Sequence, residues 1–86
     1  MKLVNVGFGN LVNAERVVAV VGPDSAPVRR IIQNAKEAGR LIDVTQGRKT
    51  YSVVFTDSEH IILSYLKADR IVKRFEGADG EETDGE

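Results

Sequence analysis

The sequence LIDVTQGRKTYSVVFT, residues 41–56, holds two β-prone runs on either side of a short polar turn. Its first five and last seven residues are rich in β-branched and aromatic side chains, which favour strands. Gly47 lies between the two runs and can adopt the positive φ angle of a tight turn. The pattern therefore predicts a β-hairpin with Arg48 and Lys49 at or beside its tip.

Further runs of apolar residues predict more strands. Leu3–Phe8 is a short apolar run interrupted by glycine, and Arg16–Val21 is rich in valine. Because residues 9–14 are too few for a crossover, we expect these two strands to pair antiparallel. After the turn Asp57–Glu59, the segment His60–Tyr65 predicts another strand.

Between these β-prone runs the hydrophobic period changes to that of a helix. Apolar residues recur at helical spacing over residues 28–35, Pro27 suits the first turn, and Gly39 suits the position just after the end. Asp24 or Ser25 is placed to cap the N-terminus of this helix.

A second, short helix is expected at Ala68–Phe75, where Ile71, Val72 and Phe75 follow helical spacing. The resulting order is two strands, a helix, three strands and a helix. It predicts an α+β fold, a small and mostly antiparallel β-sheet domain with one main helix and a short C-terminal helix. A chain of 86 residues has room for one domain, which we place at residues 1–75.

The formal net charge of −1 hides an uneven distribution. Of the 13 acidic residues, six lie in residues 76–86, a glycine-containing segment without any basic residue. Such a segment is expected to be a disordered acidic tail. Residues 1–75 keep all 12 basic residues against 7 acidic ones, a formal charge of +5. The expected folded body is therefore moderately basic.

Several classes of chemistry find little support. Cysteine is absent, and no apolar run approaches the roughly 20 residues that span a bilayer. We therefore expect a cytoplasmic protein without disulfides or thiolate metal ligands. His60 opens an apolar strand, where a structural role is favoured over general-base catalysis. Asp57 and Glu59 flank a serine in a turn, which favours a turn-forming aspartate and a solvated glutamate over a catalytic pair. We expect no enzyme, no cofactor and no metal.

Gly7 and Gly9 follow a predicted strand, as in the first half of a dinucleotide-binding loop. The third glycine and the helix that should follow are missing, and another β-rich run comes next. Glycines that permit a bulge or the close approach of another backbone are therefore favoured. A nucleotide or small-molecule sensor remains the weaker alternative.

Basic residues are the better candidates for function. The helix macrodipole mildly disfavours cations near a helix N-terminus, where Arg29 and Arg30 lie. Guanidinium groups gathered at such a position fit a site that binds anions. A solvated surface, or pairing with Asp24 or Glu37, explains the helical arginines equally well. The candidates for nucleic-acid contact are Arg16, Arg29, Arg30, Arg48 and Lys49.

Four stretches taken together resemble one known family. They are KLVNVGFGN at 2–10, SAPVRRIIQ at 25–33, GRLIDVTQGRKT at 39–50 and DSEHIILS at 57–64. They are similar to the RemA family of extracellular-matrix regulatory proteins. The resemblance implies a bacterial, nucleoid-associated transcriptional regulator of biofilm-matrix genes. It also implies a ring-shaped homo-oligomer of seven or eight subunits that binds double-stranded promoter DNA around its outside.

The resemblance also implies roles for single residues. It maps the family's DNA-contacting arginines onto Arg16, Arg48 and Lys49, and it ties Pro27 to subunit packing. The family has two arginines where this chain has Arg48 and Lys49. Lysine keeps the charge but loses the bidentate fork, so contact with the phosphate backbone is expected to survive better than base recognition. The alternative class is an oligomeric scaffold or protein-interaction module that does not bind DNA.

Overall fold

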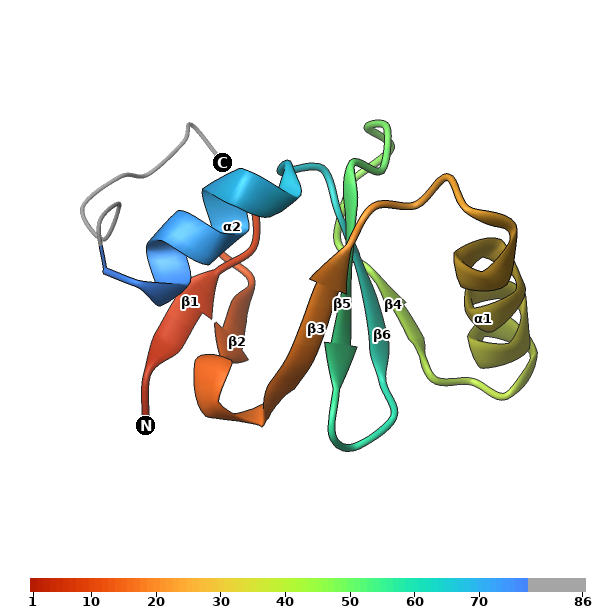
Figure 1. Cartoon of the computed structure of the whole chain (residues 1–86), viewed down its shortest axis with the longest axis horizontal. Helices are drawn as coiled ribbons and strands as arrows, with labels where there is room; N and C mark the ends of the chain where they lie inside the picture. The colour runs from red at the N-terminus through yellow and green to blue at the C-terminus, as the bar shows by residue number, and fades with distance from the viewer. Residues whose placement is uncertain (78–86) are drawn as a thin grey trace.

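The structure, a computed structural model, describes residues 1–77, which form a small α+β domain (Figure 1). The elements are β1 (Leu3–Asn5), β2 (Leu11–Asn13), the short 3-10 helix η1 (Ala14–Arg16), β3 (Val17–Val21), α1 (Ala26–Glu37), β4 (Leu41–Asp43), β5 (Ser52–Thr56), β6 (Ile61–Ser64) and α2 (Ala68–Phe75). Of the predicted tail, only Glu76 and Gly77 are described, and residues 78–86 lie outside the described part. Within residues 1–77 no helix is long and apolar enough to cross a membrane.

The strands form two sheets of unequal size. The larger sheet has the order β3-β5-β6-β4, in which β5 pairs antiparallel with both β3 and β6, while β4 pairs parallel with β6. The smaller sheet is the antiparallel hairpin of β1 and β2. The expected α+β class is therefore confirmed, and the larger sheet is mixed, with one parallel pair, β4 with β6, beside its two antiparallel pairs.

Side chains of the two central strands alternate between the faces of the larger sheet, as strand geometry requires. On one face Val54 and Ile62 pack with Val6 and with Ile71 of α2, under the β1–β2 hairpin. On the other face Val53, Ile61 and Leu63 pack with Ala35 of α1 and its neighbours. The domain thus has two small cores, one on each side of the sheet.

The predicted hairpin at residues 41–56 is wrong. β4 pairs with β6, and β6 lies between β4 and β5. Gly47 does adopt a positive φ angle of 83°, and Gln46 before it has a φ angle of 53°. The turn is therefore real, but it lies in a connection that crosses over the end of β6. A turn signal fixes local backbone geometry and leaves the pairing partner open.

The predicted pairing of the first two strands is also wrong. Val17–Val21 pairs with β5, and β1 pairs with Leu11–Asn13, which had been assigned to a connecting loop. The reason is the turn at Gly7–Gly9, where three consecutive residues have positive φ angles. Such a turn reverses the chain within a few residues, so β1 pairs with β2, and β3 pairs with β5 in the larger sheet.

Both helix predictions are confirmed. The side chain of Ser25, rather than Asp24, caps α1 by accepting a hydrogen bond from Val28 N at 3.2 Å. Gly39 follows the helix with a φ angle of 75°, the left-handed geometry common after a helix C-terminus. α2 has the predicted bounds.

Two buried serines join the small hairpin and α2 to the larger sheet. Ser64 Oγ donates a hydrogen bond to Val6 O at 2.8 Å and accepts one from Leu66 N at 3.0 Å. Ser52 Oγ donates to Leu66 O at 2.7 Å. Both serines are completely buried, so these hydroxyls satisfy backbone groups that water cannot reach.

Replacing Ser64 with Ala should lower the free energy of unfolding by about 1–3 kcal/mol, because Val6 O and Leu66 N would lose their partner. Urea unfolding at matched protein concentration measures this change. Ser58→Ala is the control, since Ser58 is exposed in the β5–β6 turn and its loss should cost less than about 0.5 kcal/mol. Equal losses in the two variants would contradict the role given to the buried hydroxyl.

Candidate nucleic-acid interface

Four connections meet at one end of the larger sheet. Val21, at the end of β3, is paired with Val53, and Ser52 at the start of β5 is paired with Ser64 at the end of β6. The loops 22–25, 44–51 and 65–67 therefore lie at this end. The β1–β2 turn joins them through the Ser64 hydrogen bond. In Figure 1 these connections lie along the upper side of the molecule.

The connection between β4 and β5 is closed by local hydrogen bonds. Asp43 Oδ1 accepts from both Thr45 N at 2.9 Å and Thr45 Oγ1 at 2.7 Å. Arg48 N then donates to Thr45 O at 3.1 Å across the two left-handed residues. This is the geometry of a type I′ turn. It leaves the side chains of Arg48 and Lys49 exposed at the end of the sheet.

Arg48 lies over two aromatic rings. Its guanidinium carbon is 5.6 Å from the centroid of Phe8 and 5.6 Å from that of Tyr65. The two ring centroids are themselves 4.9 Å apart. An arginine within about 6 Å of a ring gains cation–π attraction, so the rings restrict where this exposed guanidinium can point.

The glycines before β2 explain how the ring of Phe8 comes to lie beside Tyr65 and Arg48. Val6 N donates to Asn10 O at 2.9 Å, which closes the turn around Phe8. A Cβ atom on Gly7 would lie 3.0 Å from Tyr65 Cε1, and the φ angle of Gly7 is +122°. A close approach therefore does occur at Gly7, but the neighbour is the aromatic side chain of Tyr65 and not the backbone that was expected.

A second aromatic ring supports two lysines. Lys49 Nζ lies 5.2 Å and Lys67 Nζ 5.6 Å from the centroid of Tyr51. Neither Lys67 nor the aromatic residues at this end were among the candidates predicted from the sequence. Their only signal in the sequence was that aromatic residues stand close to basic ones in two segments, Arg48–Tyr51 and Tyr65–Lys67.

The helical arginines lie at the same end of the sheet. Arg29 and Arg30 are exposed in the first turns of α1, which follows the 22–25 loop. Within residues 1–77 neither of them forms an ion pair, so the pairing with Asp24 or Glu37 that the sequence allowed does not occur. Glu37 instead accepts a hydrogen bond from Gln33 Nε2. We call Arg29, Arg30, Arg48 and Lys49 together the basic end.

Arg16 lies at the opposite end of the sheet. It precedes β3, whose first residue Val17 is paired with Thr56 at the far end of β5. Its Nε atom donates to Asp57 Oδ1 at 2.8 Å and Oδ2 at 2.9 Å, and its side chain is 60 % exposed. The structure therefore brings four of the five candidates to one end and separates Arg16 from them.

The candidate catalytic residues His60, Asp57 and Glu59 lie at the opposite end, in or beside the β5–β6 turn. His60 Nδ1 is hydrogen-bonded to Ser58 Oγ at 2.8 Å. Asp57 is engaged by Arg16, and Glu59 lies exposed in the turn with a φ angle of 67°. No group of three or more metal-binding side chains occurs among residues 1–77.

The fold and this end define a small α+β domain with a basic surface supported by aromatic rings. Residues 3–75 match the RemA-like family, described as extracellular matrix regulatory protein A-like, and the chain belongs to this family. The family resemblance drawn from the sequence is thus confirmed.

Relatives named "Putative regulatory protein" support the same family. One from Geobacillus thermodenitrificans is 49% identical over 79 residues, covering 92% of this chain and 91% of the relative. One from Acetivibrio thermocellus is 50% identical and covers 98% of this chain and 90% of the relative. One from Nitratidesulfovibrio vulgaris is 58% identical and covers 86% of each. The family and these names give the chain a regulatory role.

Gly7→Ala should destabilise the fold by about 1–3 kcal/mol for its backbone conformation, and further because the new Cβ meets the Tyr65 ring. Gly9→Ala is the matched control, since its φ angle is +76° but nothing lies within 4 Å of the new Cβ. Chemical unfolding of both variants measures the difference. A smaller loss for Gly7→Ala than for Gly9→Ala would contradict the tight packing against Tyr65.

Proposed function

We propose that this chain is a DNA-binding transcriptional regulator that grips the phosphate backbone of double-stranded DNA with its basic end and acts as a homo-oligomer. The observation that carries the proposal is the aromatic support of Arg48 and Lys49, which holds two exposed cations in place. Cations held in this way lose less freedom when they bind an anion.

The charges of the basic end favour a polyanion. Within residues 1–77 none of its four cations takes part in an ion pair, so all of them can attract phosphates. Neutralised phosphates release counterions, and this release drives DNA binding irrespective of base sequence. Lys49 presents a point charge rather than a fork, which suits the backbone better than base edges.

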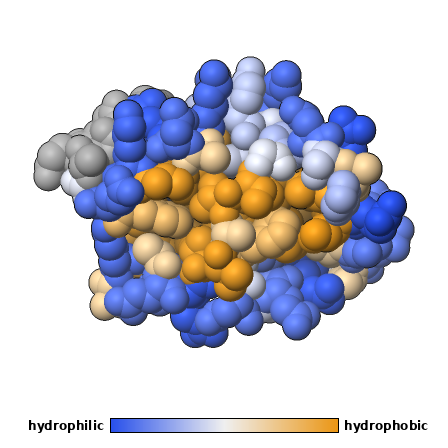
Figure 2. Space-filling view, in the orientation of Figure 1, coloured by the Kyte–Doolittle hydropathy of each residue, from blue (hydrophilic) through white to orange (hydrophobic). Residues whose placement is uncertain are grey.

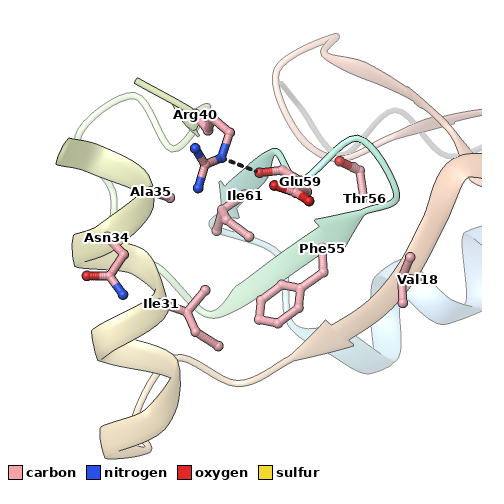
Figure 3. A pocket seen from close by; sticks show the side chains of 9 residues that line it. All are labelled: Val18, Ile31, Asn34, Ala35, Arg40, Phe55, Thr56, Glu59 and Ile61. Carbon is pink, nitrogen blue, oxygen red and sulfur yellow. Dashed lines mark hydrogen bonds between the residues drawn. The ribbon is translucent and has the colours of Figure 1, made fainter. Parts of the chain in front are cut away.

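An apolar band across one face supports association between copies (Figure 2). Val18 of β3 is 68 % exposed, and β3 is an edge strand of the larger sheet. Val18, Ile31 and Phe55 help to line a groove of about 390 Å³ between α1 and the sheet (Figure 3). Exposed apolar patches with polar rims are typical of protein interaction sites. We assign this band to a second copy of the chain.

The apolar band and the basic end can act together in DNA binding. The apolar band crosses the middle of the face in Figure 2, while hydrophilic side chains occupy its upper rim. Association through the band would leave the basic ends uncovered and close to one another. Several linked sites then bind DNA at high effective concentration, although each one is weak.

The family resemblance adds the finer parts of the proposal. It supplies the ring of seven or eight subunits, the biofilm-matrix genes as targets and the nucleoid as location. It also assigns Arg16 to DNA contact and Pro27 to subunit packing. Pro27 is exposed in the first turn of α1, where a neighbouring subunit can reach it. Arg16 would have to exchange its ion pair with Asp57 for a phosphate, or meet DNA beside that ion pair.

A non-catalytic scaffold is the second candidate, and the apolar band is the observation that favours it. A scaffold needs the band but has no use for supported cations at the end of the sheet. The dependence of DNA affinity on salt separates the two, because only a DNA-binding protein shows counterion release.

Lys49→Ala should weaken binding to a mixed-sequence duplex by about three- to tenfold and reduce the salt slope by about one per bound subunit. Fluorescence anisotropy at several salt concentrations measures both effects. Lys36→Ala is the matched control, because Lys36 is an exposed lysine in the last turn of α1, away from the basic end. If both variants lose affinity equally, the charge of the whole protein and not the basic end drives binding.

Val18→Asp should convert the homo-oligomer to smaller species, since a carboxylate would have to be buried at the interface. Mass determination in solution, with and without DNA, measures the change. Ile42→Asp is the control, because Ile42 is 43 % exposed on β4, the other edge of the sheet. A wild-type chain that is already monomeric in both conditions would exclude the oligomeric part of the proposal.

A further inference from the structure

Tyr51 holds two ammonium groups that come from different segments. Lys49 belongs to the β4–β5 connection, and Lys67 is the residue just before α2. Their Nζ atoms lie 5.2 Å and 5.6 Å from the same ring centroid. Tyr51 itself is tied to the sheet, since its backbone N donates to Ser64 O at 2.9 Å. The backbone that carries the ring is therefore anchored, and two flexible side chains are gathered around the ring.

This gathering is not explained by pairing of charges inside the domain. In the described part of the chain neither Lys49 nor Lys67 forms an ion pair. Two like charges near one ring repel each other, and the cation–π attraction of an exposed ring is modest. An arrangement that concentrates positive charge without neutralising it is suited to an anion from outside the chain.

The surface beside the ring has room for such an anion. Tyr51 is 43 % exposed, and it borders a hollow of about 420 Å³. Lys67 and Arg70 contribute positive charge to this hollow, and Asp69 is the carboxylate in its lining. Tyr65 also lines it and carries Arg48 on its ring, so the hollow continues the surface around Arg48.

We propose that Lys67 is a further phosphate-binding residue and that Tyr51 is the positioning residue that holds Lys67 and Lys49 together as a clamp on the DNA backbone. This inference rests on the proposed function, because it extends the basic end from the 44–51 loop to the start of α2. The ligand is a phosphodiester group of duplex DNA. The clamp works through the ring of Tyr51, not through its hydroxyl.

Lysine loses much side-chain freedom when it is fixed on a ligand. The Tyr51 ring restricts that freedom before DNA arrives, so the loss on binding is smaller. Removing the ring should therefore weaken binding even though no charge is removed. Removing only the hydroxyl should have little effect.

The test uses the full chain and a fluorescent mixed-sequence duplex at two or more salt concentrations. Lys67→Ala should weaken binding by about three- to tenfold and lower the salt slope, as expected for one lost phosphate contact. Lys73→Ala is the matched control, since it removes an exposed lysine from the last turn of the same helix. Lys73→Ala should change the affinity for the duplex by less than about twofold.

Tyr51 variants test the positioning role. Tyr51→Phe should bind within about twofold of wild type, while Tyr51→Leu should lose about as much affinity as Lys67→Ala. In the Tyr51→Leu background, Lys67→Ala should add less than it does alone, because the two residues act as a unit. Circular dichroism and thermal unfolding check that each variant folds. Lys67 is exposed, so its replacement decides whether Lys67 binds DNA even if Tyr51→Leu does not fold, and without that contact the clamp is overturned.

The outcomes separate this inference from the proposed function. Salt-dependent binding by wild type, together with equal affinities of Lys67→Ala and Lys73→Ala, would overturn the inference alone. So would a Tyr51→Phe variant as weak as a folded Tyr51→Leu variant. A wild-type chain that does not bind duplex at any salt concentration would overturn the proposed function and the clamp with it.

Discussion

The parallel pairing of β4 with β6 is the constraint on which the candidate site depends. β5 occupies the other side of β6, so the chain must cross the end of β6 to pass from β4 to β5. The residues that leave β6 run directly beneath this crossing. Arg48 therefore meets Tyr65, and Lys49 and Lys67 meet at Tyr51. A simple hairpin between β4 and β5 would have carried the two basic residues away from these rings.

Aromatic support gives the crossing a defined charged surface. A basic residue on an exposed turn is normally free to sample many rotamers, and fixing it on a ligand has an entropic cost. Each cation–π contact at an exposed site is worth only about 0.5–1 kcal/mol, which is too little to stabilise the fold noticeably. It is enough, however, to bias where a guanidinium or an ammonium group points. Phe8, Tyr51 and Tyr65 are thus placed to orient charge, and Tyr65 also packs against the core.

Local structure could be predicted from the sequence, but the arrangement of the strands could not. The helix Ala68–Phe75 and the turn at Gly47 follow from hydrophobic period and glycine, which act over a few residues. Strand pairing depends on which faces bury each other across the whole chain, and two β-prone runs around a glycine look the same in a hairpin and in a crossing. For the same reason Lys67 gave only the weak signal of a nearby aromatic residue, and Arg16 could not be placed at the far end of β3.

The small size of the domain links its stability to its proposed activity. Each face of the sheet buries only a small cluster of apolar residues, and Val18 and Ile31 remain exposed beside one of them. A domain of this length gains much by covering such a face, because its own core is thin. In the proposed function, one basic end alone would bind DNA weakly at physiological salt, since it would neutralise few phosphates. Association between copies would both stabilise the fold and strengthen DNA binding, because it would bury the exposed face and multiply the phosphate contacts. Folding, assembly and DNA binding would then be coupled, and each would stabilise the others.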